Sequence, residues 1–450
     1  MRTRRTAPTR HHRLVGHSNL PPFTRRRDEL KKQHVVVVGG GLIGLSSAYA
    51  LLRDGHRVTI IERDHLGAGA ATGNAGELTP QQVAPLASPN TARDVLRGVF
   101  TRTSYLSIDA LRLPALAGFG LGFIKASGKR GTARGSAALA QFSGEILPAM
   151  HRMAADGIDI SGGGDGYLMT CSEEGALQAA HAGYQHRADL GWGEAPGKIM
   201  RNAELAAHEP TLDPGVTGGF MLPAEFSLDP VTFVASLADH IRAAGADVRT
   251  GLTALRLGQG ASVECEDEIR QPVTISGDKV VVAAGAWTTP FLQRSGVRST
   301  KVVSGKGYSF TVSVETMPST LIHAMDRHCV AIPMHGRLRI VGMMEFDQQP
   351  TRMNRDRFDV LTRAAAGLIT GGDWENRTDE WVGPRPMTAD GMPLLGRVPG
   401  RADVIVASGH NMHGLSLGPV TGEVVADLVA NRVTQVKGKN LDLTPFAVRR

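Results

Sequence analysis

The stretch that decides the fold begins at residue 34 and reads His34-Val-Val-Val-Val-Gly-Gly-Gly-Leu-Ile-Gly44. Its β-branched run predicts a buried strand, and the glycines follow that strand directly. Residues 45–53 continue with the composition of a helix, and the run over 57–61 predicts a second buried strand that leads into Glu62. The sequence therefore predicts a strand, a Gly-x-Gly-x-x-Gly turn, a helix, a strand and an acid within about thirty residues.

Each part of this unit has a physical role in binding an adenine dinucleotide. The first glycine permits a tight turn, the second lets backbone approach a pyrophosphate, and the third lets the helix pack on the strand. The helix N-terminus offers unpaired N–H groups to the phosphates, and the acid can accept both hydroxyls of the adenosine ribose. The pattern does not choose between FAD and NAD. The candidate contacts are Gly39, Gly41, Leu42, Ile43, Gly44, Glu62 and Arg63.

The composition is that of a soluble globular protein rather than a disordered, collagen-like or transmembrane chain. Of the 450 residues, 42% are hydrophobic and 21% are charged, and the length suggests about two or three domains. The net charge of +7 comes from residues 1–33, which hold ten Lys or Arg and two acids, since the rest holds 40 basic and 41 acidic residues. A body that binds nucleic acid is therefore not expected. We expect residues 1–33 to be a disordered extension or a start assigned too far upstream, with weak attraction to anionic lipid as the alternative.

The three cysteines, Cys171, Cys265 and Cys329, lie far apart and outside any Cys-x-x-Cys or His-Cys cluster. Their spacing favours neither a disulfide framework nor a metal site, and it is typical of a reducing compartment. The longest apolar stretch, 113–124, is too short and too rich in glycine to span a bilayer. We therefore expect a cytoplasmic protein, with a peripheral contact to the inner face of the membrane as an option that the basic tail leaves open.

Three later segments carry small residues of the kind that let backbone lie close to a large planar ligand. A glycine-rich loop covers 67–76, and the buried strand predicted over 279–282 stops on Ala283-Ala-Gly-Ala-Trp287. A strand over 404–407 runs into glycines and then into a helix expected over 421–429, whose N-terminus would face the same ligand. The candidate contacts in these segments are Thr72, Asn74, Ala75, Gly76, Ala284, Gly285, Trp287, Gly409, Asn411, Gly414 and Leu415.

A set of short motifs runs along residues 34–432, nearly all of the chain after the tail: Gly39–Gly44 with Glu62, Thr72–Gly76, Pro80 with Pro85, Ala283–Trp287, Gly307-Tyr308-Ser309, Gly383-x-Arg385-Pro386, Gly409-His410-x-x-x-Gly414 and Pro419-x-Thr-Gly422. With these motifs the chain resembles the FAD-dependent amine and amino-acid oxidoreductases related to D-amino acid oxidase, glycine oxidase and sarcosine oxidase. The bacterial D-amino acid dehydrogenases look most similar. The resemblance implies FAD, held non-covalently, because segment 387–390 lacks the cysteine that tethers flavin in sarcosine oxidases.

The resemblance implies an α/β fold with two domains. One is a Rossmann-like FAD-binding domain of discontinuous segments, and the other is an α+β substrate-binding domain whose mixed sheet covers the flavin. Residues 230–244 predict a helix capped by Asp229, and Ala254 matches a family segment whose main chain meets the adenine. We expect the FAD-binding domain over 34–95, part of 140–300 and 378–434, the substrate domain mainly over 96–139 and 301–377, and a C-terminal tail over 435–450.

The activity that the resemblance implies is oxidation of an amino acid at its α carbon, with hydride transfer to flavin and release of a 2-oxo acid and ammonia. Arg385 matches the arginine that holds the substrate carboxylate, and its planar guanidinium suits a bidentate contact; a structural ion pair is the alternative. Tyr308 is a candidate for a hydroxyl that faces the substrate, or else a core tyrosine. His410 and His413 are candidates for tuning the flavin, or else for bonding the backbone.

Several other functions remain open at this point. Within the family, the enzyme could demethylate an N-methyl amino acid or betaine, dehydrogenate hydroxyproline, or use oxygen as an amino acid oxidase does. A dehydrogenase would pass electrons to a quinone or an electron-transfer protein, and the basic tail favours that choice. A flavin-binding subunit without turnover belongs to a different class, and the presence of Arg385 and an intact phosphate loop argues against it. The expected partners are thus a small amino acid and an electron acceptor, and no nucleic acid.

Overall fold

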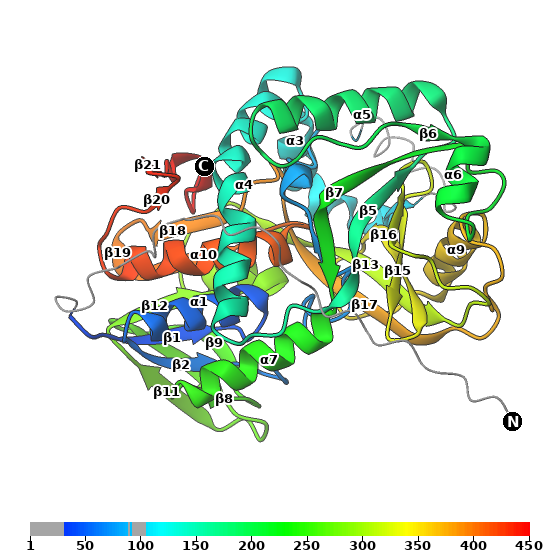
Figure 1. Cartoon of the computed structure of the whole chain (residues 1–450). Helices are drawn as coiled ribbons and strands as arrows, with labels where there is room; N and C mark the ends of the chain where they lie inside the picture. Colours follow the sequence, from blue (N-terminus) through cyan, green and yellow to red (C-terminus); the bar gives the residue numbers. More distant parts are fainter. Residues whose placement is uncertain (1–30, 89–90, 92–104) are drawn as a thin grey trace, which may run out of the picture.

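The computed structural model describes residues 31–88, 91 and 105–450. The first 30 residues of the predicted basic tail and the predicted domain boundary at 95/96 lie outside these residues. Two large sheets dominate the described part, and helices pack against both (Figure 1). The helices are α1 (Leu42–Arg53), α3 (Leu113–Ala126), α4 (Lys129–Ala155), α5 (Glu174–Asp189), α6 (Asn202–His208), α7 (Pro230–Ala243), α8 (Thr288–Arg294), α9 (Arg355–Ala366) and α10 (Gly414–Val429), with short 3₁₀ helices η1 (Pro80–Gln82), η2 (Ala110–Arg112), η3 (Gly285–Trp287) and η4 (Thr444–Phe446).

The six-stranded sheet is built from segments that lie far apart in the sequence. Its central strand β1 runs parallel to β2 on one side and to β12 on the other, with Val36 paired to Thr59 and to Val280. The predicted strand, glycine turn, helix and strand are therefore present as β1, α1 and β2, and the predicted α/β fold is confirmed. In sheet order the strands are β18 (Leu394–Val398), β19 (Arg401–Ser408), β12 (Lys279–Val282), β1 (His34–Val38), β2 (Arg57–Ile61) and β8 (Asp247–Arg249).

The two faces of this sheet pack against different partners, because successive strand residues point in opposite directions. Val35 and Val37 of β1 share a core with α1, α4, α7 and α10. Val36 and Val38 share another core with a three-stranded antiparallel sheet. Burial on both faces explains why β1 is a continuous apolar run rather than an alternating one. The three-stranded sheet consists of β9 (Thr253–Leu257), β10 (Ser262–Glu266) and β11 (Pro272–Ser276).

A ten-stranded mixed sheet forms the second large layer, as the resemblance implied. Helix α9 packs Phe358 and Leu361 into one of its cores, and α5 packs Leu177 and Tyr184 into another. The path of the sheet runs from β17 at one end to β3 at the other, while β4 and β6 pair with β16 and β7 off this path. In sheet order the strands are β17 (Thr378–Thr388), β13 (Val302–Val312), β16 (Arg337–Phe346), β15 (Cys329–Met334), β14 (Leu321–Ala324), β5 (Gly162–Thr170), β7 (Gly218–Leu228) and β3 (Glu77–Leu78), with β4 (Leu106–Ile108) and β6 (Met200–Arg201) beside them.

Local sequence signals predict α7 correctly and α10 only in part. The Asp229 carboxylate accepts hydrogen bonds from the backbone N–H groups of the first turn of α7, which confirms the predicted cap. Helix α10, in contrast, begins at Gly414 rather than at the expected Thr421. Pro419 lies inside the helix, where its missing N–H leaves a single carbonyl without its helical donor. The start of α10 therefore follows the glycine-containing loop after β19 directly.

The C-terminal segment 435–450, expected to be a tail, packs onto the body of the protein. It forms a two-stranded sheet of β20 (Gln435–Val436) and β21 (Lys439–Asn440), and the buried Phe446 lies 5.1 Å from Phe142 between ring centroids.

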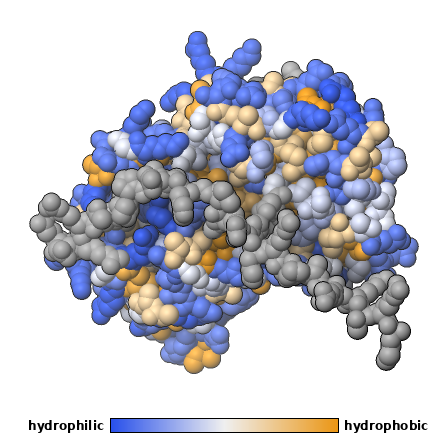
Figure 2. Space-filling model, viewed as in Figure 1, coloured by the Kyte–Doolittle hydropathy of each residue, from blue (hydrophilic) through white to orange (hydrophobic). Residues whose placement is uncertain are grey.

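The domain boundaries stay a prediction. On the face drawn in Figure 2, hydrophilic residues cover much of the rim. Within the described residues, no helix is long and apolar enough to cross a membrane.

Candidate cofactor and substrate site

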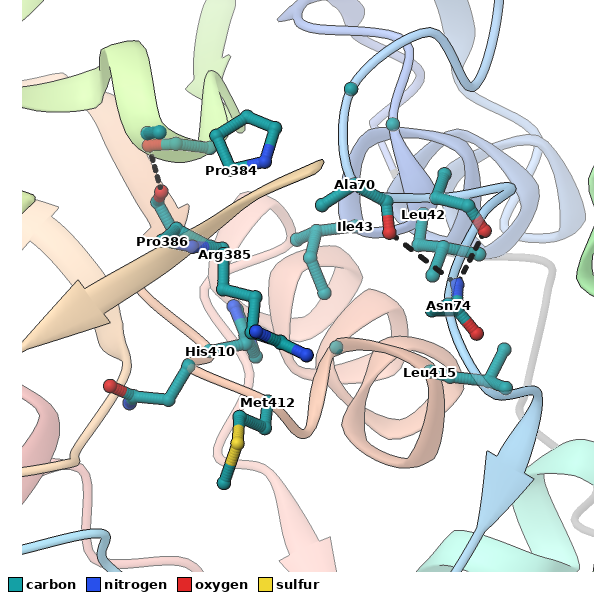
Figure 3. A pocket seen from close by; sticks show the side chains of 18 of the residues that line it. Leu42, Ile43, Ala70, Asn74, Pro384, Arg385, Pro386, His410, Met412 and Leu415 are labelled. Atoms are coloured by element: carbon teal, nitrogen blue, oxygen red, sulfur yellow. Dashed lines mark hydrogen bonds between the residues drawn. The ribbon is translucent and has the colours of Figure 1, made fainter. Parts of the chain in front are cut away.

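A cavity of about 570 Å³ lies between the two large sheets. Residues at the carboxyl ends of β1, β2, β12 and β19 line one side of it, which is where open α/β sheets bind ligands. Strands of the ten-stranded sheet line the other side, and Figure 3 shows side chains from several of these elements around the space. All the predicted site residues lie in the described part, and four of them do not line the cavity: Gly44, Thr72, Gly76 and Tyr308.

The turn between β1 and α1 has the geometry that a phosphate-binding loop requires. A Cβ atom on Gly39, where φ is +107°, would lie 2.5 Å from the Ala283 carbonyl oxygen, and one on Gly44 would lie 1.9 Å from the Gly39 carbonyl oxygen. A Cβ on Gly41 would meet no atom within 4 Å, since that position borders the cavity. Helix α1 has no side-chain cap, so its first N–H groups are available to a ligand. Gly44 thus serves packing, and Gly41 leaves room for a close approach.

The acid at the end of β2 lies at the rim of the same turn. One oxygen of the Glu62 carboxylate accepts a hydrogen bond from Gly40 N–H at 2.8 Å, and the other accepts one from Asp64 N–H at 3.1 Å. Each oxygen keeps further lone pairs for the two hydroxyls of a ribose. Next to it, the Arg63 guanidinium lies 3.8 Å from the centroid of the Trp287 ring, and both residues line the cavity. Ala254 on β9 lines the same part of the cavity.

The loop after β2 is held in shape by its own side chains. Asn74 donates to the Ala71 carbonyl oxygen at 2.6 Å and accepts from Gly76 N–H at 2.8 Å, while Thr72 points back to the Gly67 carbonyl oxygen. A Cβ on Gly76, with φ of +67°, would lie 1.9 Å from the Leu228 carbonyl oxygen. Asn74 and Ala75 line the cavity, whereas Thr72 and Gly76 fix the loop behind it. The side chains of this loop therefore hold its backbone in shape and supply no reactive group to the cavity.

The start of α10 is the second helix N-terminus at the cavity. Asn411, with φ of +53°, ties the loop down: its side chain accepts from Thr388 N–H and donates to the carbonyl oxygens of Gly391 and Gly409. Gly414 and Leu415 open the helix and line the cavity, and a Cβ on Gly414 would meet no atom within 4 Å. The unpaired N–H groups of the first turn favour negative charge on a ligand.

The two histidines of this loop are neutral by their surroundings. Burial lowers the pKa of His410 to about 3 and also lowers the pKa of His413. His413 Nε2–H donates to the Ala84 carbonyl oxygen at 3.0 Å, and His410 Nε2 lies 3.0 Å from the Thr421 hydroxyl. His410 Nδ1 is buried and has no hydrogen-bond partner among the described residues, although His410 lines the cavity. This nitrogen is therefore free to form one hydrogen bond with a ligand in the cavity.

Arg385 projects from β17 into the cavity (Figure 3). One nitrogen, Nη1, donates to the Met343 carbonyl oxygen at 2.9 Å, and no carboxylate of the described residues forms an ion pair with the guanidinium. Burial lowers the pKa of Arg385 to about 10, and the attraction of Glu77 opposes that shift. The remaining N–H groups are left for a ligand, so the geometry favours a carboxylate site over a structural ion pair.

Tyr308 lies elsewhere. Its side chain is fully buried in the core under α9, edge-on to Phe358 at 5.2 Å between ring centroids. Its hydroxyl donates to the Glu345 carboxylate, which Lys306 also contacts. Since alternate residues of a strand point to opposite faces, β13 directs Tyr308 away from the cavity. We therefore leave Tyr308 out of the substrate site.

A hydrogen-bonded chain at the cavity wall was not among the predicted site residues. Glu77 on β3 and His323 on β14 line the cavity, and Tyr167 on β5 joins them: its hydroxyl lies 2.7 Å from Glu77 Oε1 and 2.7 Å from His323 Nδ1. Burial raises the pKa of Glu77 and lowers that of His323 to about 4. The only sequence signal was the position of Glu77, directly after the glycine-rich loop. No group of three or more potential metal ligands occurs within the described residues.

Comparison with known proteins identifies the family of the chain and several similar proteins. The family model described as FAD dependent oxidoreductase matches residues 34–428. The chain is 30% identical over 427 residues to the D-amino acid dehydrogenase of Phenylobacterium zucineum (strain HLK1), covering 92% of this chain and 96% of that protein. Its structure resembles glycine oxidase from Geobacillus kaustophilus, with a TM-score of 0.70, 25% identity, and coverage of 93% of this chain and 99% of that chain. It also resembles iminodiacetate oxidase from Chelativorans sp. BNC1, with a TM-score of 0.66, 22% identity, and coverage of 92% and 99%.

Proposed function

Because this chain belongs to the FAD dependent oxidoreductase family, we propose that it oxidises an amino acid at the α carbon, as a D-amino acid dehydrogenase, to an imino acid that water then hydrolyses to a 2-oxo acid and ammonia. The observation that carries the proposal is Arg385, a buried cation at the cavity wall that forms no ion pair with any carboxylate of the described residues. A planar guanidinium left free in this way suits the carboxylate of an amino acid. The similarity to a D-amino acid dehydrogenase supports the D configuration.

The residues around the cavity fit FAD. The α1 N-terminus and the open space at Gly41 suit the pyrophosphate, Glu62 suits the ribose, and the unpartnered His410 Nδ1 suits a polar edge of the flavin. When bound, FAD supplies the hydride acceptor for the oxidation. We propose that the binding is non-covalent, because none of the three cysteines, all of which the structure describes, lines the cavity.

The chain's own residues would then orient the substrate. Arg385 would hold the carboxylate through the N–H groups that Met343 does not use. His410 and His413 would remain neutral at physiological pH, so they would add no positive charge beside the flavin. The N-terminus of α10 would instead supply the favourable field for negative charge. The enclosing sheets would keep water from the α carbon.

The electron acceptor that we propose is a quinone or an electron-transfer protein at a membrane surface. Leu113, Leu121 and Ile124 of α3 are exposed and, at 100° per residue, share one face of the helix. Exposed basic residues follow closely: Lys125, Lys129, Arg130 and Arg134. An apolar face beside positive charge suits an anionic lipid surface. Co-sedimentation with vesicles of anionic lipid should fall when Leu121 and Ile124 are both replaced by Ser, and an unchanged pellet fraction would contradict this contact.

The test of the proposed reaction is anaerobic. Purified holoenzyme is mixed with D- and L-amino acids and with N-methyl and cyclic amino acids, and the visible band of the flavin is followed. Bleaching with D-amino acids, followed by slow recovery in air, is the expected result. Bleaching only by N-methyl or cyclic substrates would instead favour a demethylase or a hydroxyproline dehydrogenase. Fast recovery in air would identify an oxidase.

A further inference from the structure

An acidic and a basic side chain face one cavity from the two ends of the ten-stranded sheet. Arg385 belongs to β17 at one end of the strand order, and Glu77 belongs to β3 at the other end. Both line the cavity, and each stabilises the charged form of the other. They do not form an ion pair with each other. An amino acid carries a carboxylate and an ammonium group on one carbon, so its two charges match this pair.

The hydrogen bonds of Glu77 hold one oxygen and leave the other available. Oε1 lies 2.7 Å from the Tyr167 hydroxyl, while Oε2 has no hydrogen bond to any of the described residues. Tyr167 is fully buried and lies between Glu77 and His323, so the three side chains form a chain across β3, β5 and β14. The carboxylate is therefore fixed in place with one oxygen for a ligand.

This chain accommodates both charge states of Glu77. With a carboxylate, Tyr167 donates to Glu77 and accepts from His323 Nδ1–H. With a proton on Oε2, Oε1 still accepts from the Tyr167 hydroxyl, and the Tyr167 oxygen still accepts from His323 Nδ1–H. Burial lowers the pKa of His323 to about 4, so its ring is neutral and keeps the one N–H that this arrangement needs. The hydrogen bonds of the chain therefore need not rearrange when Oε2 takes up a proton.

We propose that Glu77 binds the substrate's ammonium group and accepts its proton, while Tyr167 and His323 position the carboxylate for this step. The inference rests on the proposed oxidation, in which the α carbon gives up hydride only when its amine is neutral. One N–H bond of the ammonium breaks and one O–H bond forms on Glu77 Oε2, so the substrate becomes the neutral amine and Glu77 a carboxylic acid. No electrons move in this step. Glu77 is thus a catalytic residue, and the other two are positioning residues.

The charged surroundings support a base at this position. Burial raises the pKa of Glu77, the Tyr167 hydrogen bond and Arg385 oppose that shift, and a higher pKa brings the acid closer to an amine in proton affinity. A second buried acid, Glu225, does not line the cavity; burial and, to a smaller extent, the charge of Glu77 raise its pKa. The titratable and charged groups on the elements around Glu77 are Tyr167 on β5, Tyr184 on α5, Glu225 on β7, His323 on β14, Arg385 on β17 and His413 beside α10.

The direct test is Glu77→Gln, which keeps the shape and removes the base. Flavin reduction by the substrate, measured anaerobically by stopped flow, should slow about 100-fold at pH 7. The rate should recover at alkaline pH, where the substrate reaches the enzyme as the neutral amine. Glu225→Gln is the matched control, because it removes a buried acid of the same sheet outside the cavity, and its rate should stay normal. A normal rate in Glu77→Gln at pH 7 would overturn the proposal.

The positioning role of Tyr167 has its own readout. Tyr167→Phe removes the hydrogen bond that lowers the pKa of Glu77, so the rise of the reduction rate with pH should move to higher pH. Tyr184→Phe is the control, since Tyr184 is also buried in this core but makes no hydrogen bond to Glu77. A lower rate in Tyr167→Phe with an unshifted pH profile would show that Tyr167 only supports the fold, which would contradict its assigned role.

A binding experiment separates this inference from the proposed function. 2-Aminoisobutyrate has no α hydrogen to transfer, and isobutyrate lacks the amine. Wild-type holoenzyme should bind the first about tenfold more tightly by calorimetry, Glu77→Gln should lose this preference, and Arg385→Met should bind neither. If no substrate bleaches the wild-type flavin, the proposed function fails, while this comparison still decides whether Glu77 recognises the amine. A further outcome is that Glu77→Gln loses activity only with those amino acid substrates that have a basic side chain. That result would show that Glu77 binds the side chain of the substrate and not its amine, and it would overturn the proposal.

Discussion

The two large sheets contribute to the cavity by different means. The six-stranded sheet contributes mainly backbone to the cavity. Gly39 and Gly44 allow close contact between backbone segments, and Gly41 leaves space beside the N-terminus of α1. The ten-stranded sheet presents side chains, with Glu77 and Arg385 from its two ends. The backbone site depends on glycines, which have no Cβ atom, within one short stretch of sequence. The side-chain site depends on the order in which distant strands pair, so the two kinds should fail in different ways when they are mutated.

The largest effect is expected from Gly44→Ala. The new Cβ would lie 1.9 Å from a backbone oxygen of Gly39, so α1 must move off β1. We expect a loss of about 3 kcal/mol or more in the free energy of unfolding, together with loss of FAD. The checks are the melting temperature and the visible absorbance of the purified protein. Gly175→Ala in α5, where a Cβ would meet nothing within 4 Å, is the control, and equal melting temperatures for the two variants would contradict the packing argument.

Arg385→Met should have the opposite profile. Without the guanidinium, kcat/KM should fall on the order of 100-fold, which corresponds to a few kcal/mol of transition-state binding. The melting temperature should stay the same or rise, because burial costs the guanidinium its hydration and the attraction of Glu77, which forms no ion pair with it, offsets that cost only in part. The FAD content should be unchanged. Near-normal activity would remove Arg385 from the substrate site.

Glu225→Gln sharpens the comparison within the ten-stranded sheet. Burial raises the pKa of Glu225 from 4.5 to about 8, so the folded protein keeps this proton while the unfolded chain releases it. The free energy of unfolding of the wild type should therefore fall as pH rises from 4.5 to 8. Glutamine does not ionise, so the variant should be more stable than the wild type by about 2 kcal/mol or more at pH 8, and the gap should close near pH 4.5. Urea unfolding at both pH values measures the gap, and a gap independent of pH would show that the Glu225 proton is not its cause.

The smallest effect is expected from Gly41→Ala. This glycine has φ of −81°, which any residue adopts, and a Cβ would meet no protein atom within 4 Å. The stability of the apoprotein should therefore stay within about 0.5 kcal/mol of the wild type. The affinity for FAD should fall about tenfold, or about 1.4 kcal/mol, because the Cβ enters the space left for the pyrophosphate. Fluorescence titration of the apoprotein with FAD checks this, and unchanged affinity would place the phosphates elsewhere.

The contrast between a local backbone site and a site built from distant strands also decides how much of the cavity could be predicted from the sequence. The unit of β1, α1 and β2 could be predicted because the strand, turn, helix and acid follow one another within 34–62. Glu77 adjoins a predicted loop, yet its partner Tyr167 is 90 residues away and His323 lies another 156 residues further. No periodicity in the sequence shows that β5 and β14 bring those side chains together. The pairing appears only when the strand order is known.

Two differences between expectation and structure have local physical causes. Tyr308 belongs to a motif whose place along β13 is correct, but one step of strand alternation decides which face a side chain takes, and that step was not fixed by the sequence. The predicted start of α10 at Thr421 rests on the apolar face of residues 424–429, whereas the helix begins at Gly414 and contains Pro419. The start of α10 therefore lies at the cavity, as expected, but seven residues earlier in the chain than predicted, and its role toward a ligand stays a prediction.

The strand order of the six-stranded sheet also has a consequence for the synthesis of the chain on the ribosome. β1 and β2 emerge first, but β12 and β19 pair on the other side of β1, and α10 closes the cavity only after Gly414 has been made. Until then the apolar side of α1 lacks the helix that covers it, as well as the second helix N-terminus at the ligand. We therefore expect cofactor capture to follow translation rather than accompany it. A nascent chain stalled before α10 would be a target for chaperones and proteases even though its phosphate-binding turn is complete.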